Sequence, residues 1–154
     1  MNEKTVSVAV SSKIKLVRVD LQYTQEEMAN MIGISKKTLI QIEKRRQVAN
    51  WSIVVTFVSL FNDHPIVQHA LGEFNPIELI QLITRDEINF ENKEVNPNVM
   101  YWNHIKEKQG YRLEQNHLNQ TYRVVDQNLK LFYRSINYEN TKRYFANLMT
   151  HNYR

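Results

Sequence analysis

The sequence predicts a mainly α-helical protein in two parts, an N-terminal helical bundle that contains a helix-turn-helix and a small C-terminal α+β domain of order α-β-β-β-α. Apolar residues recur at helical spacing through residues 12–61, which indicates a bundle with its own core. After Gly110, apolar and polar residues alternate, as is typical of strands. The expected boundaries are a helical domain at 1–84, a linker at 85–98 and an α+β domain at 99–154.

The first segment of the helix-turn-helix begins at Thr24. Thr24 and Glu27 have the spacing of a capping box, in which each side chain accepts a backbone amide of the other residue. Gly33 follows the last apolar position and is suited to the left-handed conformation that ends many helices. The inward positions of this helix are expected to be Met28, Ala29 and Ile32.

The second segment begins after Ser35, a good N-cap residue. Leu39 and Ile42 are three residues apart and are expected to anchor this helix in the core. Its outer face is cationic and polar, with Lys36, Lys37, Gln41, Lys44, Arg45 and Arg46. A capped helix N-terminus that carries lysines is well suited to phosphates and to base edges.

The spacing of five residues matches a known pattern. A Gln opens the first helix, an Ala and then a Gly follow at intervals of four, and aliphatic residues come six and nine positions after the Gly. These residues are Gln25, Ala29, Gly33, Leu39 and Ile42. The stretch from about Ser12 to Phe61, about a third of the chain, therefore resembles the phage-repressor (Xre-type, lambda-repressor-like) helix-turn-helix family.

The resemblance implies a set of DNA-binding residues. Lys36, Lys37 and Gln41 would point into the major groove, and Gln25 would lie against the DNA backbone near the groove edge. The remaining candidates, near phosphates or at the helix N-terminus, are Ser35, Thr38, Lys44, Arg45 and Arg46. The plainer alternative is an amphipathic helix pair whose lysines form only a solvated face.

We therefore expect a transcriptional regulator that binds double-stranded DNA sequence-specifically. It is expected to be a repressor and to act as a homodimer without a cofactor. Dimerisation would place two recognition helices on successive major grooves. The alternative function is a protein-interaction module, such as an antitoxin or antirepressor, that grips a partner protein through its C-terminal domain.

Composition agrees with an anionic partner but does not require one. The net charge is +4, and residues 1–72 hold nine Lys and Arg against six Asp and Glu. The absence of cysteine and of a long apolar stretch suits a cytoplasmic protein that does not enter a membrane. The many asparagines and few glycines suggest a bacterial source.

No enzymatic chemistry is indicated. The five histidines form no HExxH pattern and no i, i+4 pair, so a metal site is not expected. The chain also lacks the glycine-rich patterns of phosphate and dinucleotide loops.

The rest of the helical part is expected to begin with a frayed or strand-like segment, Met1 to Val10. Ser11 or Ser12 would then cap the first helix. Asn50 would cap a helix at 51–61 with two apolar faces, one of them covered by a partner subunit or by the C-terminal region. Two shorter helices are expected at 65–71 and 76–84.

The C-terminal domain is expected to contain a helix at 97–108, strands at 111–116, 122–126 and 129–136, and a last helix capped by Asn137. It resembles a C-terminal extension of Gram-positive bacterial regulators, and the likeness is carried by Trp102, Gln115, Asn116, Tyr122, Arg123 and Asp126. This domain would dimerise or sense a ligand or a partner protein. Its strand aromatics are expected in a core with the arginines on the solvated face, although they could instead stack single-stranded nucleic acid.

Overall fold

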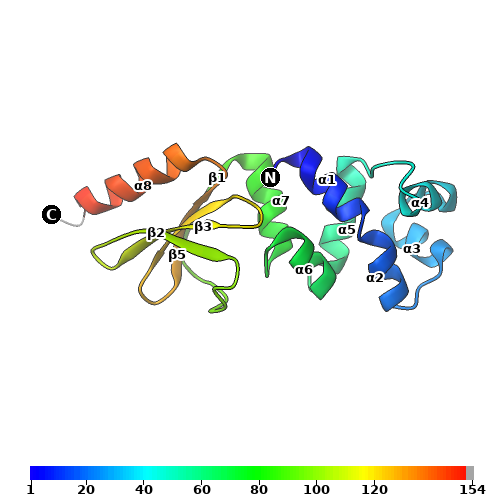
Figure 1. The fold of residues 1–154 in the computed structure, drawn as a ribbon, viewed down its shortest axis with the longest axis horizontal. Coiled ribbons are helices and arrows are strands. Elements are labelled where there is room, and N and C mark those ends of the chain that lie inside the picture. Colours follow the sequence, from blue (N-terminus) through cyan, green and yellow to red (C-terminus); the bar gives the residue numbers. More distant parts are fainter. Residues whose placement is uncertain (152–154) are drawn as a thin grey trace. The chain divides into compact units, whose positions relative to one another are not determined.

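The computed structural model describes residues 1–151 and divides into two compact units (Figure 1). The helical unit comprises Asn2–Ile80. The sheet unit comprises Met1 and the chain from Gln81 onward. The helix α7 (Pro76–Arg85) crosses this boundary along the chain.

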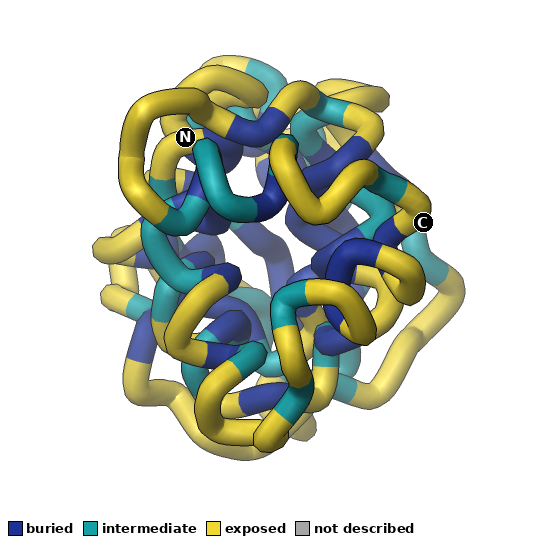
Figure 2. The backbone as a smooth tube through the Cα atoms, turned by 90° about the vertical axis from the view of Figure 1, so that its right-hand side faces the viewer, coloured by how far each residue is buried: buried dark blue, intermediate teal, exposed yellow. Residues whose placement is uncertain are grey.

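The helical unit is built from short helices. They are α1 (Glu3–Ser11), α2 (Ile14–Asp20), α3 (Gln25–Ile32), α4 (Lys36–Glu43), α5 (Trp51–Phe61) and α6 (Pro65–Leu71). Each helix turns apolar residues inward, and buried and exposed stretches alternate along the chain (Figure 2). Fully buried side chains that define this core include Val6, Ile14, Val17, Met28, Leu39, Val54 and Phe57.

The N-terminal segment is helical, so the expectation that Met1 to Val10 is frayed or strand-like is wrong. Asn2 and Thr5 form a capping box at the start of α1. Val6 and Val10, four residues apart, are buried, whereas Val8 between them is 51% exposed. The alternation of valines therefore arises from a helix with one buried face. Neither Ser11 nor Ser12 caps the start of a helix, contrary to expectation, because Ser11 is the last residue of α1 and Ser12 is its C-cap.

Local signals place α5 and α6 as expected. The side chain of Asn50 accepts the Ile53 amide at 3.0 Å. One broad face of α5 is buried, and it comprises Ile53, Val54, Phe57, Val58 and Phe61. Pro65 occupies the first turn of α6, and Gly72 ends that helix with a φ of +64°.

The sheet unit contains an antiparallel sheet of five strands, counted over residues 1–151, in the order β1-β5-β4-β3-β2. The strands are β1 (Glu87–Glu94), β2 (Trp102–Lys108), β3 (Tyr111–Asn116), β4 (Tyr122–Asp126) and β5 (Lys130–Ser135). The expectation of a mainly α protein is wrong, because helix accounts for 49% of the residues and strand for 21%, and strands make up most of the C-terminal part.

The order α-β-β-β-α is wrong in two places. Residues 102–108, expected in a helix, form the edge strand β2, in which Trp102 is opposite Asn116 of β3. Gln109 and Gly110, with φ of +54° and +80°, make the two-residue turn of this hairpin. Gly110 therefore closes a β-turn and does not end a helix.

The expected linker at 85–98 contains the other edge strand, β1, which pairs with β5. Ile88 is the one buried residue of this polar strand and Phe90 is half-buried, so the apolar alternation stops after two residues. Both edge strands have an irregular register, between Asn89 and Lys93 in β1 and between His104 and Lys106 in β2.

The helix α8 (Tyr138–His151) packs on β3, β4 and β5. Asn137 caps it, as expected, by accepting the Asn140 amide at 3.1 Å. The core between α8 and the sheet contains Leu113, Val124, Tyr133, Phe145 and Met149. These residues give the sheet unit a hydrophobic core of its own.

Candidate nucleic-acid interface

The capping signals that predicted α3 are present in atomic detail. The hydroxyl of Thr24 accepts the Glu27 amide at 3.1 Å, and the carboxylate of Glu27 accepts the Thr24 amide at 3.0 Å. Gly33 has a φ of +85°, and the next amide, of Ile34, donates to the carbonyl of Ala29 at 3.0 Å. This glycine allows the chain to leave α3 and begin α4 within a few residues.

The helix α4 is fixed at its start and along its inner face. The hydroxyl of Ser35 accepts the Thr38 amide at 3.0 Å and lies 2.8 Å from the Thr38 hydroxyl. Leu39 and Ile42 are 0% and 1% exposed, so they anchor α4 in the core of the helical unit. The opposite face of α4 is exposed to solvent.

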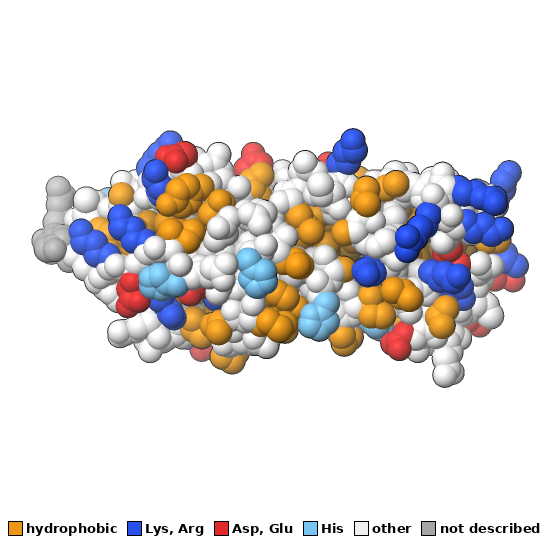
Figure 3. Space-filling model, in the orientation of Figure 1, with side chains coloured by type: hydrophobic (Ala, Val, Ile, Leu, Met, Phe, Trp, Pro, Cys, Tyr) orange, Lys and Arg blue, Asp and Glu red, His pale blue; other side chains and the backbone are white. Residues whose placement is uncertain are grey.

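That opposite face carries the positive charge. Exposed side chains at and just after α4 are Ser35, Lys36, Lys37, Lys44, Arg45 and Arg46, and Thr38 and Gln41 are half-buried beside them. Figure 3 shows blue side chains gathered over the end of the helical unit that contains α3 and α4. Residues 36–46 contain five cations and one acidic residue, Glu43.

The end of α4 is a Schellman motif made without glycine. Arg45 has a φ of +58°, its amide donates to the Ile42 carbonyl, and the Arg46 amide donates to the Gln41 carbonyl. The motif turns the chain sharply, so Arg45 and Arg46 remain beside the cationic face of α4.

An ion pair that the sequence did not predict lies beneath this face. Glu43 is one turn beyond Leu39, on the inner side of α4, and its side chain is 3% exposed. Arg18 of α2 donates to it through Nε at 2.5 Å and Nη2 at 3.1 Å, and the Gln25 amide donates at 2.8 Å. Gln25 is therefore held by Glu43 and is half-buried. The ion pair could have been suspected from the sequence, because Glu43 is a charged residue on the inner face of its helix.

Electrostatics keeps this carboxylate ionised. Burial by itself would raise the pKa of Glu43, but hydrogen bonds from Arg18 and Gln25 and the charge of Arg18 outweigh burial and lower the pKa. Because Arg18 neutralises Glu43, the acidic residue subtracts little from the positive potential of the exposed lysines and arginines.

The histidines show no arrangement for metal binding. Within residues 1–151 no three His, Asp or Glu side chains come together to hold an ion. His64 has a structural place: its Nδ1 accepts the Ile66 amide at 3.2 Å, and its Nε2 lies 2.7 Å from Asp20. No helix in this described range is both long and apolar enough to cross a membrane.

Two of the three strand arginines, Arg123 and Arg134, are buried and Arg112 is half-buried, so the expectation that the arginines lie on a solvated face is wrong. Arg123 and Arg134 are 4% and 1% exposed, and their guanidinium carbons lie 4.0 and 5.0 Å from the centre of the Trp102 ring. Arg123 also pairs with Glu114 at 2.7 Å. These side chains do not form an open stacking surface for single-stranded nucleic acid.

Comparisons of the chain with protein-family models, with curated proteins and with solved structures find no match. The likeness of residues 12–61 to the phage-repressor family is therefore a resemblance that rests on the residues themselves.

Proposed function

We propose that the chain is a sequence-specific, double-stranded DNA-binding transcriptional regulator that acts as a dimer, with repression as its expected effect. The observation that carries this proposal is α4, a capped helix anchored by Leu39 and Ile42 whose outer face is cationic and exposed. A short exposed helix of this kind fits the major groove of B-form DNA.

Under this proposal, the first two turns of α4 read the bases. Lys36, Lys37 and Gln41 would meet base edges, where lysine favours the acceptor atoms of guanine and glutamine suits adenine. Phosphate contacts would come from Lys44, Arg45 and Arg46, which are exposed at the end of the helix. The Ser35 cap leaves the positive end of α4 oriented toward solvent, where a phosphate is stabilised.

The ion pair of Arg18 with Glu43 supports the proposal indirectly. A recognition helix whose angle is fixed before DNA binds gives tighter base readout, because ordering it on binding would reduce affinity. Arg18, Gln25 and Glu43 join α2, α3 and α4 by hydrogen bonds. Gln25 has one amide hydrogen engaged in this way and retains a second donor for a phosphate.

Dimerisation is proposed on physical grounds. One helix reads only a few base pairs, and two copies on successive major grooves, about 34 Å apart, double the base contacts. The expected target is therefore an inverted repeat.

The test is the affinity of the purified protein for DNA from its own upstream region and for random duplex, measured across a salt series by fluorescence anisotropy. We expect the specific site to bind at least about a thousandfold more tightly. We also expect the logarithm of the association constant to fall steeply with the logarithm of salt concentration. Weak binding that is equal on both duplexes would contradict the proposal and favour the partner-binding module.

A further inference from the structure

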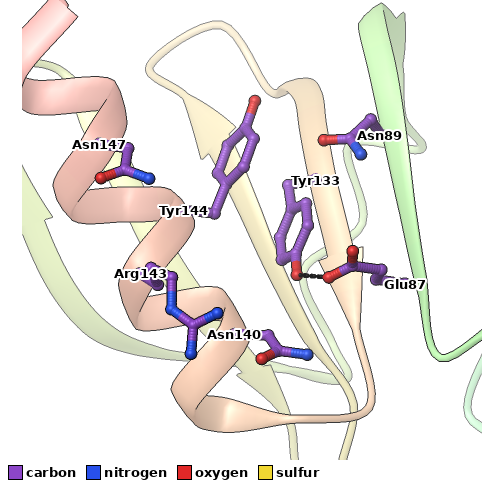
Figure 4. Close-up of a pocket in the computed structure, with 7 residues that line it drawn as sticks. All are labelled: Glu87, Asn89, Tyr133, Asn140, Arg143, Tyr144 and Asn147. Carbon is purple, nitrogen blue, oxygen red and sulfur yellow. Dashed lines mark hydrogen bonds between the residues drawn. The ribbon is translucent and has the colours of Figure 1, made fainter.

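A groove of about 260 Å³ opens between the edge strand β1 and the helix α8 (Figure 4). It exists because α8 covers β3, β4 and β5 and leaves β1 at the edge of the sheet without a covering helix. Its volume is below the usual range for drug-sized ligands, so it suits a smaller molecule. Its walls are polar, which is unusual for a space next to a hydrophobic core.

The floor of the groove is rigid and aromatic. The Tyr133 ring stacks on the Tyr144 ring, with centroids 4.3 Å apart and planes 8° from parallel. The Tyr133 hydroxyl donates a hydrogen bond to the carboxylate of Glu87. Burial first, and then this hydrogen bond, raise the pKa of Tyr133, so the hydroxyl remains a neutral donor that orients Glu87.

The wall on the side of α8 carries a cation between two amides. Asn140, Arg143 and Asn147 are spaced by three and four residues and therefore share one face of the helix. Arg143 is exposed and forms no ion pair with any residue that the structure describes. A guanidinium flanked by amide donors is a binding group for a carboxylate.

The wall on the side of β1 carries the opposite charge. Glu87 and Asn89 are on the same side of β1, two residues apart, and both are exposed. Figure 4 shows Glu87 and Arg143 on opposite sides of the Tyr133 hydroxyl. A simple anion would be repelled by Glu87, and a simple cation would be repelled by Arg143.

We propose that this groove binds a small zwitterion of the free α-amino acid class. The ligand carboxylate would pair with Arg143 and accept a hydrogen bond from the neighbouring Asn140, and its ammonium would pair with Glu87. This arrangement places each ligand charge against the protein charge of opposite sign. The proposal is independent of DNA binding, because every residue that it uses belongs to the sheet unit.

The test is titration of the full chain, labelled with ¹⁵N, with each of the common L-amino acids at up to about 10 mM, the range expected for a ligand of this size. We expect at least one amino acid to produce saturable shifts of the Arg143 Nε–H and of the Asn140 and Asn147 side-chain amides. The N-acetyl and the carboxamide derivatives of that amino acid, each lacking one charge, should bind at least about tenfold more weakly.

Matched variants complete the test. Arg143→Gln and Glu87→Gln should each weaken binding at least about tenfold. Lys142→Gln on the same helix and Glu91→Gln on the same strand change the same charges outside the groove and should bind as the wild type does. The proposal is overturned if no amino acid gives saturable shifts, or if the N-acetyl derivative binds as tightly as the amino acid. Equal binding by the groove and control variants would also overturn it.

Discussion

Arg18 of α2 and Glu43 of α4 form a two-point ion pair, with Nε donating to Oε1 at 2.5 Å and Nη2 donating to Oε2 at 3.1 Å. The guanidinium also donates to the carbonyl of Tyr23 at 3.0 Å, so three of its hydrogens are engaged. A forked contact of this kind fixes orientation as well as distance. It links the cationic helix to the rest of the helical unit through a side chain that is almost fully buried.

The first prediction concerns this pair. Glu43→Gln keeps the shape of the side chain but leaves the Arg18 guanidinium partly buried without its counter-charge, so the free energy of unfolding should fall by about 1–3 kcal/mol. The measurement is equilibrium unfolding in urea. Glu26→Gln removes an exposed carboxylate of α3 and should change stability by less than about 0.5 kcal/mol. Equal stability of the two variants would contradict the prediction.

The second prediction is the pH dependence of the same pair. The pKa of Glu43 is lower in the folded protein than its ordinary value of 4.5. Its stabilisation is therefore fully present above pH 4.5 and is lost as the pH falls through the lower folded value. The stability difference between wild type and Glu43→Gln should be large at neutral pH and should shrink in acid. A difference that stays constant with pH would show that the carboxylate charge is not its source.

The third prediction tests the proposed division of α4 between base contacts and phosphate contacts. Lys37→Ala should reduce the binding free energy by about 1–3 kcal/mol on the specific site and by less on random duplex. Lys44→Ala, at the other end of the helix, should weaken binding to both duplexes by a similar amount and lower the salt slope by about one. Fluorescence anisotropy on both duplexes distinguishes the cases. If Lys37→Ala also reduces the affinity equally for the specific site and for random duplex, Lys37 contacts only phosphate.

The fourth prediction uses the left-handed residue after α4. Arg45 has a φ of +58°, which only glycine adopts without strain, so Arg45→Gly should leave stability unchanged or raise it by up to about 1 kcal/mol. Arg45→Ala removes the same charge but keeps a Cβ, so it should not increase the stability. Both variants should bind DNA more weakly and with a smaller salt slope. Thermal unfolding and DNA titration of the pair together check this prediction. A loss of stability in the glycine variant would count against it.

The helical unit was largely predictable because its signals are local. Thr24, Ser35 and Asn50 each cap a helix within the next three residues, and Gly33 ends α3 by its own conformation. The outer face of α4 follows from its position opposite Leu39 and Ile42. The partner of Glu43 was not predictable, because Arg18 is 25 residues away along the chain.

The two edge strands were missed for a physical reason. The strand β1 is held by backbone hydrogen bonds to β5, whose paired residues lie 36 to 48 positions further along the chain, whereas β2 pairs with the adjacent β3 in a hairpin. The side chains of β1 and β2 are mostly exposed, so no apolar alternation marks them. The groove between β1 and α8 was missed because the β1–β5 pairing brings Glu87 to Tyr133, which lies 46 residues away along the chain.

The irregular edges of the sheet have a consequence for the protein in a crowded cell. A flat, open strand edge is a template on which further chains can add, and repeated addition leads to filaments. Here both edges are interrupted by a bulge, and the exposed side chains beside the bulges include Lys93, Glu94, Lys106 and Lys108. Charged residues and bulges on edge strands oppose edge-to-edge pairing, so addition of further copies to this sheet into filaments is disfavoured.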